Sequence, residues 1–126
     1  IDFVINEGFE CEVDVWFVDD KLFLGHDNPE SEISFEWLEK NSQSLWIHCK
    51  NFEALNFLKN LNDKFNFFWH QKDDFTLTSK GYIWTYPEKK YDKNSVIVKL
   101  DSKLPKNLDL YAVCTDFVLE MSNSTL

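Results

Sequence analysis

The sequence predicts an α/β fold with mostly parallel strands. The apolar runs 45–50 and 65–70 are typical of short buried strands, and apolar residues recur every three or four positions from Asn51 onward, as in a helix. Strands and helices that alternate at this spacing indicate βαβ units, whose strands run parallel. The candidate functional residues of each predicted strand are assigned to its carboxyl end, so we expect them to gather at one rim. These residues are Glu12, Asp14, His48, Lys50, Trp69, His70, Trp84 and Asp116.

Local signals predict where each element begins and ends. From Glu10 to Val18 polar and apolar residues alternate with the period of a strand, and the following acidic residues favour a hairpin turn. Ser34 can cap a helix, whereas Pro29 and Pro87 end strands. In chain order we expect a helix end at 1–8, strands at 10–18 and 22–27, a helix at 34–41, a strand at 45–50, a helix at 51–61, a strand at 65–70, a turn of helix at 73–79, strands at 82–86, 96–98 and 111–114, and a helix at 117–121.

Composition limits the class of protein. A length of 126 residues suits one domain, and an aromatic content of 17% favours a packed core over disorder. The net charge of −9 argues against nucleic acid as a partner. The sequence has no run of 18 apolar residues, so we expect no integral membrane segment. Cys11, Cys49 and Cys114 lack the spacing of a zinc site or a disulfide framework, so we expect free thiols in a reducing, cytoplasmic compartment.

Three carboxylates are predicted to share one face of the first strand. Glu10, Glu12 and Asp14 are two residues apart, and crowded carboxylates favour a bound cation. The return strand ends in His26 and Asp27, which brings an imidazole back toward these acids. The alternative is a solvated strand face with a surface histidine.

Four motifs, kept in order, resemble those of the glycerophosphodiester phosphodiesterase family. They cover an acidic strand with a histidine loop, a third strand, a Trp-Thr strand and a closing Thr-Asp pair. The matching segments are Glu12-x-Asp14 with His26–Asp27, Leu45–Lys50, Ile83–Thr85 and Val113–Asp116.

The resemblance implies a metal-dependent phosphodiester hydrolase of lipid metabolism that acts on a small phosphodiester substrate. The family belongs to the phospholipase-C-like phosphodiesterase superfamily, which has a TIM-type β/α barrel and uses Mg²⁺ or Ca²⁺. A complete barrel needs at least about 200 residues, so we expect a reduced or truncated barrel here. We expect residues 1–126 to form a single domain that lacks the family's first strand. Its open strand edges would be covered by that strand or by a second copy in a homo-oligomer.

The resemblance also implies roles for individual residues. Glu12 and Asp14 become metal ligands, with His48 in the place of a third carboxylate ligand, while His26 becomes a catalytic histidine. Lys50 would neutralise the substrate phosphate. The expected substrate contacts are Trp84 from the Trp-Thr strand, and Trp69 and His70 from the end of the strand at 65–70, where a place in the core is the alternative for Trp69.

Two departures from the family pattern leave alternatives open. The family's His-Arg-Gly motif precedes its acidic strand, and nothing at 1–8 matches it. Imidazole binds Mg²⁺ and Ca²⁺ poorly, so His48 leaves open a weaker metal site, a different metal or none, and also a purely structural histidine. The alternative functions are a non-catalytic relative that binds a phosphorylated small molecule, and a structural domain without an active site.

Overall fold

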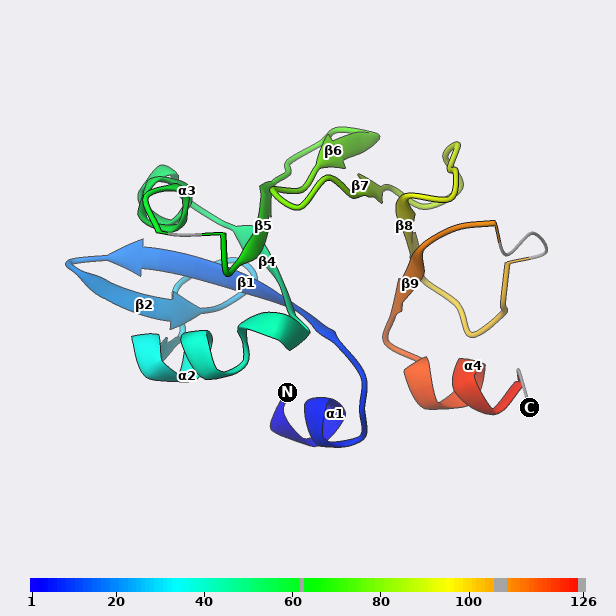
Figure 1. The fold of residues 1–126 in the computed structure, drawn as a ribbon, viewed down its shortest axis with the longest axis horizontal. Coiled ribbons are helices and arrows are strands. Elements are labelled where there is room, and N and C mark those ends of the chain that lie inside the picture. Colours follow the sequence, from blue (N-terminus) through cyan, green and yellow to red (C-terminus); the bar gives the residue numbers. More distant parts are fainter. Residues whose placement is uncertain (62, 106–108, 125–126) are drawn as a thin grey trace. The chain divides into compact units, whose positions relative to one another are not determined.

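The computed structural model describes residues 1–61, 63–105 and 109–124. Contacts within the chain divide it into two compact units, Ile1–Gln71 and Lys72–Leu126, and each is described by itself. The first unit contains a five-stranded mixed sheet and the second a four-stranded mixed sheet (Figure 1). That the two units act as a single domain stays a prediction.

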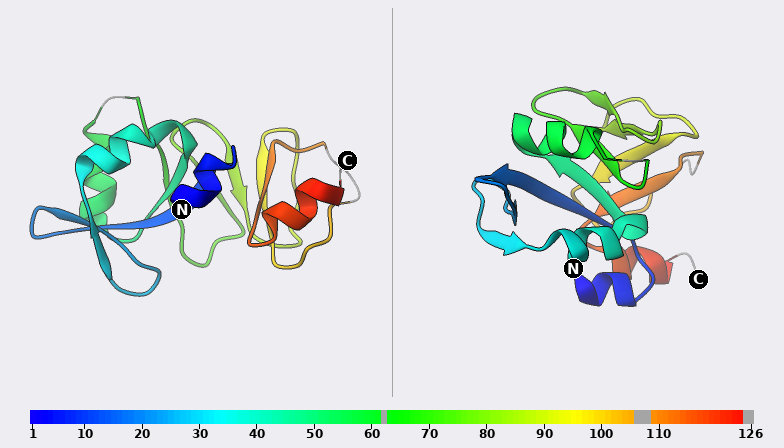
Figure 2. Two further views of the ribbon diagram at one scale, coloured as in Figure 1. Left: turned by 90° about the horizontal axis from the view of Figure 1, so that it is seen from below. Right: turned by 60° about the vertical axis from the view of Figure 1, so that its left-hand side comes forward.

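The first unit is built on the central strand β1. Its sheet has the order β3-β2-β1-β4-β5, in which β1 pairs antiparallel with β2 and parallel with β4. The hairpin of β1 and β2, drawn in blue in Figures 1 and 2, turns at Asp19 and Asp20, whose φ angles of 51° and 62° are those of a type I′ turn. The elements are α1 (Asp2–Asn6), β1 (Cys11–Val18), β2 (Lys21–Leu24), β3 (Ser31–Ile33), α2 (Phe35–Lys40), the 3₁₀ turn η1 (Ser42–Ser44), β4 (Leu45–Cys49), α3 (Phe52–Lys59) and β5 (Asn66–Trp69).

Alternation along the strands separates a core face from a polar face. On β1 and β4 the side chains that join the core are every second residue, and they pack against α2 and α3, whereas Trp46 is buried on the opposite face of β4. The core residues of these elements are Val13, Val15, Leu45, Ile47, Cys49, Leu38, Ala54 and Leu58. The residues between them on β1 and β4 therefore point to the opposite side of the sheet.

Side-chain caps begin α2 and α3. The Ser34 hydroxyl accepts a hydrogen bond of 3.1 Å from the Trp37 N–H, which confirms the predicted cap. The Asn51 Oδ1 accepts one of 3.0 Å from Ala54 N–H. Asn51 also exchanges two hydrogen bonds, of 3.2 and 3.0 Å, with the backbone of Phe17 at the end of β1. One side chain thus joins the start of α3 to the central strand.

The second unit has the sheet order β6-β7-β8-β9. Its strands β7, β8 and β9 are parallel, and β6 is antiparallel to β7. The expected turn of helix at 73–79 is wrong, because residues 75–77 pair with 83–85 and form β6 instead. The elements are β6 (Phe75–Leu77), β7 (Ile83–Thr85), β8 (Ser95–Lys99), β9 (Ala112–Thr115) and α4 (Val118–Ser124).

The prediction of a reduced TIM-type barrel is wrong. Within the described ranges the two sheets are open, with β3 and β5 at the edges of one and β6 and β9 at the edges of the other. There are four α-helices in this part of the chain, whereas a TIM barrel has eight. The physical reason lies in β2, β3 and β6, which return antiparallel through short connections, so no crossover helix joins them to a parallel neighbour. No helix among the described residues is long and apolar enough to cross a bilayer.

Candidate metal centre

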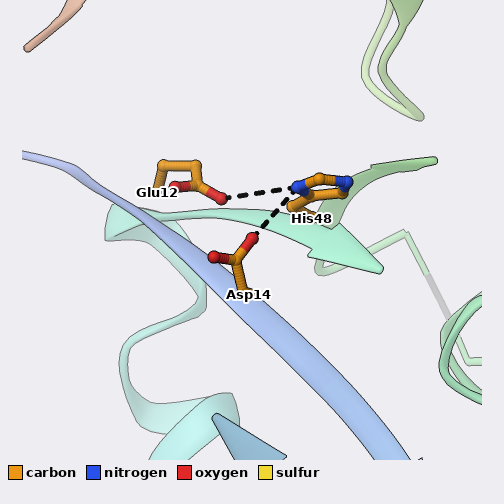
Figure 3. A group of neighbouring side chains, drawn as sticks. All are labelled: Glu12, Asp14 and His48. Carbon is orange, nitrogen blue, oxygen red and sulfur yellow. Dashed lines mark ion pairs between the residues drawn. The ribbon is translucent and has the colours of Figure 1, made fainter. Parts of the chain in front are cut away.

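Two parallel strands bring the predicted metal ligands together. In the register of β1 and β4, Asp14 lies opposite His48 and Glu12 lies opposite Trp46. Residues two apart on a strand share a face, so Glu12, Asp14 and His48 project from the polar side of the sheet (Figure 3). The structure thus brings the three predicted ligands together, whereas their role as metal ligands stays a prediction.

The three side chains converge on one nitrogen atom. Nδ1 of His48 lies 3.0 Å from Oδ1 of Asp14 and 3.9 Å from Oε1 of Glu12, as the dashed lines in Figure 3 show. One ligand atom from each residue fits within 4.8 Å of the other two. The side chains are 16% (His48), 17% (Asp14) and 26% (Glu12) exposed, so the cluster is shielded but open to solvent.

Neighbours on β5 and just after it hold the His48 ring. Nε2 of His48 lies 2.8 Å from the backbone carbonyl oxygen of His70, and a carbonyl only accepts, so Nε2 is the donor and carries a hydrogen. On its flat side the imidazole stacks on Phe68, with ring centroids 5.2 Å apart and planes 11° apart. The ring is therefore fixed with Nδ1 toward the two carboxylates.

The surrounding charges keep Asp14 ionised. Burial raises the pKa of Asp14, but hydrogen bonds with His48 and Glu12 and the nearby charges of His48 and Lys50 outweigh burial, so the pKa lies below its usual value of 3.8. Lys50 follows β4, where its backbone N–H donates a 2.9 Å hydrogen bond to the Val15 carbonyl. At neutral pH the site therefore presents negative charge, with a cationic side chain nearby.

The predicted catalytic histidine lies on the loop after β2 and outside the three-residue cluster. This loop starts beside the acidic strand, because Gly25 N–H donates to the Asp14 carbonyl at 3.2 Å and the Trp16 indole donates to the Gly25 carbonyl at 2.7 Å. The His26 side chain is 81% exposed, and its Nδ1 lies 2.9 Å from Oδ1 of Asp27. The catalytic role of His26 stays a prediction.

The predicted substrate contacts lie in different surroundings. Trp69 packs against the hydrophobic core of the first unit, and the ring of His70 lies 6.0 Å from that of His48. Trp84 belongs to β7 of the second unit and is only 7% exposed. Their roles in substrate binding stay predictions. Sequence reasoning missed Phe68 and the His70 carbonyl as supports of His48, since a backbone acceptor leaves no residue-type signal.

The donor set fits a divalent metal ion. Two carboxylates and one imidazole nitrogen supply three protein ligands, the number typical of catalytic metal sites that keep further positions for water or substrate. The hydrogen bond from His48 to a backbone carbonyl is also the usual outer support of a metal-bound histidine. That the metal is Mg²⁺ or Ca²⁺ stays a prediction.

No protein-family model matches this chain, and neither a curated protein nor a solved structure does. The resemblance to the glycerophosphodiester phosphodiesterase family stays a prediction that rests on the four ordered motifs.

Proposed function

We propose that this chain hydrolyses phosphodiesters with a divalent metal ion held by Glu12, Asp14 and His48. The observation that carries the proposal is the convergence of these three side chains within 4.8 Å, next to the strand end that carries Lys50. The four motifs that resemble the glycerophosphodiester phosphodiesterase family support the same reaction. When bound, a divalent cation supplies positive charge that stabilises the phosphoryl oxygens of the transition state.

Lys50 provides the anion-binding group of the proposed site. It is half-buried where β4 ends, and its charge helps to lower the pKa of Asp14. A half-buried lysine gains from an anionic partner, and an ammonium group binds phosphate as a point charge. We expect Lys50 to hold a non-bridging oxygen of the substrate.

His26 and Asp27 provide the proton-transfer group. The Asp27 carboxylate favours a hydrogen on Nδ1 of His26, 2.9 Å away, and this leaves Nε2 to give or take a proton. The backbone hydrogen bond from Gly25 to Asp14 keeps the start of this loop beside the acidic strand. Because the His26 side chain is exposed, a substrate can reach Nε2.

One observation favours a second candidate function, which is to bind a phosphorylated small molecule without cleaving it. The cluster of Glu12, Asp14 and His48 is complete without His26, which lies outside it. A site of this kind retains the metal and Lys50 but performs no proton transfer.

The test is cleavage of glycerophosphocholine and of an aryl phosphodiester, before and after removal of metal with a chelator. We expect cleavage that is lost with the chelator and restored by divalent ions. Asp14→Asn should lower it about 10- to 100-fold, and His26→Gln about 10²- to 10⁴-fold. Glu32→Gln is the matched control, since it removes an exposed carboxylate of β3 that pairs with Lys21.

Two results would refute the hydrolase. One is the absence of metal-dependent cleavage of both substrates, and the other is cleavage that Asp14→Asn leaves at the wild-type rate. Metal-dependent binding of glycerol phosphate that is weakened by Lys50→Met, without cleavage of either phosphodiester, would support the second candidate.

A further inference from the structure

We infer that the site formed by Glu12, Asp14 and His48 takes a divalent transition-metal ion such as Zn²⁺ or Co²⁺, in preference to Mg²⁺ or Ca²⁺, through Nδ1 of His48. The inference rests on the metal centre of the proposed function but not on the hydrolysis. It changes the metal that the resemblance implies, and it follows from how the structure holds one imidazole.

The first step is the tautomer of His48. Its Nε2 donates to the His70 carbonyl at 2.8 Å, so in the neutral ring the lone pair is on Nδ1. That lone pair faces Oδ1 of Asp14 at 3.0 Å and Oε1 of Glu12 at 3.9 Å. A lone pair beside two carboxylate oxygens is unfavourable unless a cation or a proton lies between them, so the geometry suits a metal ion at this point.

The second step is the rigidity of the ring. His48 is 16% exposed, stacks on Phe68, and is anchored at Nε2, so the imidazole is held on two sides. Phe68 is the register partner of His48 on β5 and is itself buried. Nδ1 is therefore oriented in advance, and binding a metal does not require the side chain to reorganise.

The third step is the chemistry of the donors. Ca²⁺ takes six to eight oxygen ligands and Mg²⁺ takes an octahedron of oxygens, whereas imidazole nitrogen suits Zn²⁺ and the other transition ions. Here one of the three protein ligands is a nitrogen, and its ring is held by the hydrogen bond at Nε2 and by the stacking on Phe68. A set of two carboxylates and one imidazole thus favours the transition ions.

The binding test compares Zn²⁺, Co²⁺, Mg²⁺ and Ca²⁺ on the whole chain by calorimetry. Zn²⁺ binds most protein sites more tightly than Mg²⁺, so the informative quantity is the ratio of Zn²⁺ to Ca²⁺ affinity and its change in variants. We expect His48→Asp, which replaces nitrogen by oxygen, to lower this ratio at least about tenfold. His48→Gln should weaken Zn²⁺ binding by about tenfold or more. It serves as the test variant if the third carboxylate that His48→Asp adds to the cluster prevents folding. His26→Gln is the matched control, because it removes an exposed imidazole outside the cluster.

A second readout looks at the nitrogen directly. In ¹H–¹⁵N spectra of the histidine rings, Zn²⁺ should shift Nδ1 of one histidine while its Nε2 keeps a hydrogen, and His48→Gln should remove that signal. Co²⁺ should give a visible absorption band that His48→Gln changes and His26→Gln does not.

The inference is overturned if the Zn²⁺ to Ca²⁺ ratio is unchanged in folded His48→Asp and His48→Gln, if Zn²⁺ leaves Nδ1 of His48 unshifted, or if no metal binds. The metal preference and the proposed hydrolase activity can be refuted independently. A chain that binds Zn²⁺ through His48 but cleaves no phosphodiester refutes the hydrolase alone, whereas cleavage with Ca²⁺ and no role for Nδ1 refutes the metal preference alone.

Discussion

Replacing Asn51 by Ala should be among the most damaging polar substitutions in the first unit. The Asn51 side chain makes three hydrogen bonds, one to Ala54 N–H at 3.0 Å and two to the backbone of Phe17 at 3.2 and 3.0 Å. It thereby caps α3 and extends the pairing of β1 with β4 beyond Lys50, whose N–H bonds to Val15. The alanine variant removes all three bonds at once.

The size of the effect follows from these bonds. A helix cap contributes about 1 kcal/mol, and a hydrogen bond to a half-buried backbone group contributes about 1 kcal/mol net. The expected loss in the free energy of unfolding is therefore about 3 kcal/mol for Asn51→Ala. The matched control is Ser34→Ala, which removes the single cap bond to Trp37 and should cost about 1 kcal/mol. Asn51→Asp keeps the acceptor Oδ1 but puts a carboxylate oxygen in place of the Nδ2 donor, opposite the Phe17 carbonyl oxygen, so it should be more destabilising than the control.

Urea unfolding followed by tryptophan fluorescence measures these differences, since Trp16, Trp37, Trp46 and Trp69 all lie in the first unit. With a slope of about 1–2 kcal/mol per M, the midpoint of Asn51→Ala should fall by about 1.5–3 M. If Asn51→Ala is no more destabilising than Ser34→Ala, the two bonds to Phe17 contribute nothing and the reasoning is wrong.

Three further predictions concern a tight turn, a buried thiol and the acidic site. Gly25→Ala should lower the free energy of unfolding by about 1–3 kcal/mol by thermal or urea unfolding, because an added Cβ collides with the carbonyl oxygen of Asn28; a neutral effect would show that the loop yields freely. Burial raises the pKa of Cys49 from 9.0 to about 12, so its thiol should resist Ellman's reagent until the protein unfolds, and modification of the native thiol at pH 8 would contradict this. Because the thiol ionises first in the unfolded chain, the free energy of unfolding should also fall as pH rises from about 9 toward 12. The pKa of Asp14 is lowered in the folded protein, so the stability that its carboxylate contributes is present above pH 3.8 and is lost as pH falls below that value. The difference in unfolding free energy between wild type and Asp14→Asn should therefore shrink in acid. A difference that stays constant with pH would argue against the pairing of Asp14 with His48.

Much of the candidate site could be predicted because strand alternation is a local property. The two-residue period of β1 places Glu12 and Asp14 on one face whatever β1 pairs with. The same period places His48 on one face of β4, and two parallel neighbours then bring these residues together. The contacts that hold the His48 ring were not predictable from the sequence. One is a hydrogen bond to the backbone carbonyl of His70, and the other is stacking on Phe68, which depends on the register of β4 with β5.

By itself, the sequence determined the strands of the central segments, the cap at Ser34, and which residues of a strand share a face, because each of these depends on neighbours a few positions away. Tertiary structure alone decided which strands pair and in which direction. Phe75–Leu77 became a strand because a partner at 83–85 was available, and the antiparallel returns kept the sheets open where a barrel was expected. Neighbouring strands are joined by hydrogen bonds between backbone groups, which every residue carries. Residue types therefore specify which face of a strand is buried far better than they specify the strand with which it pairs.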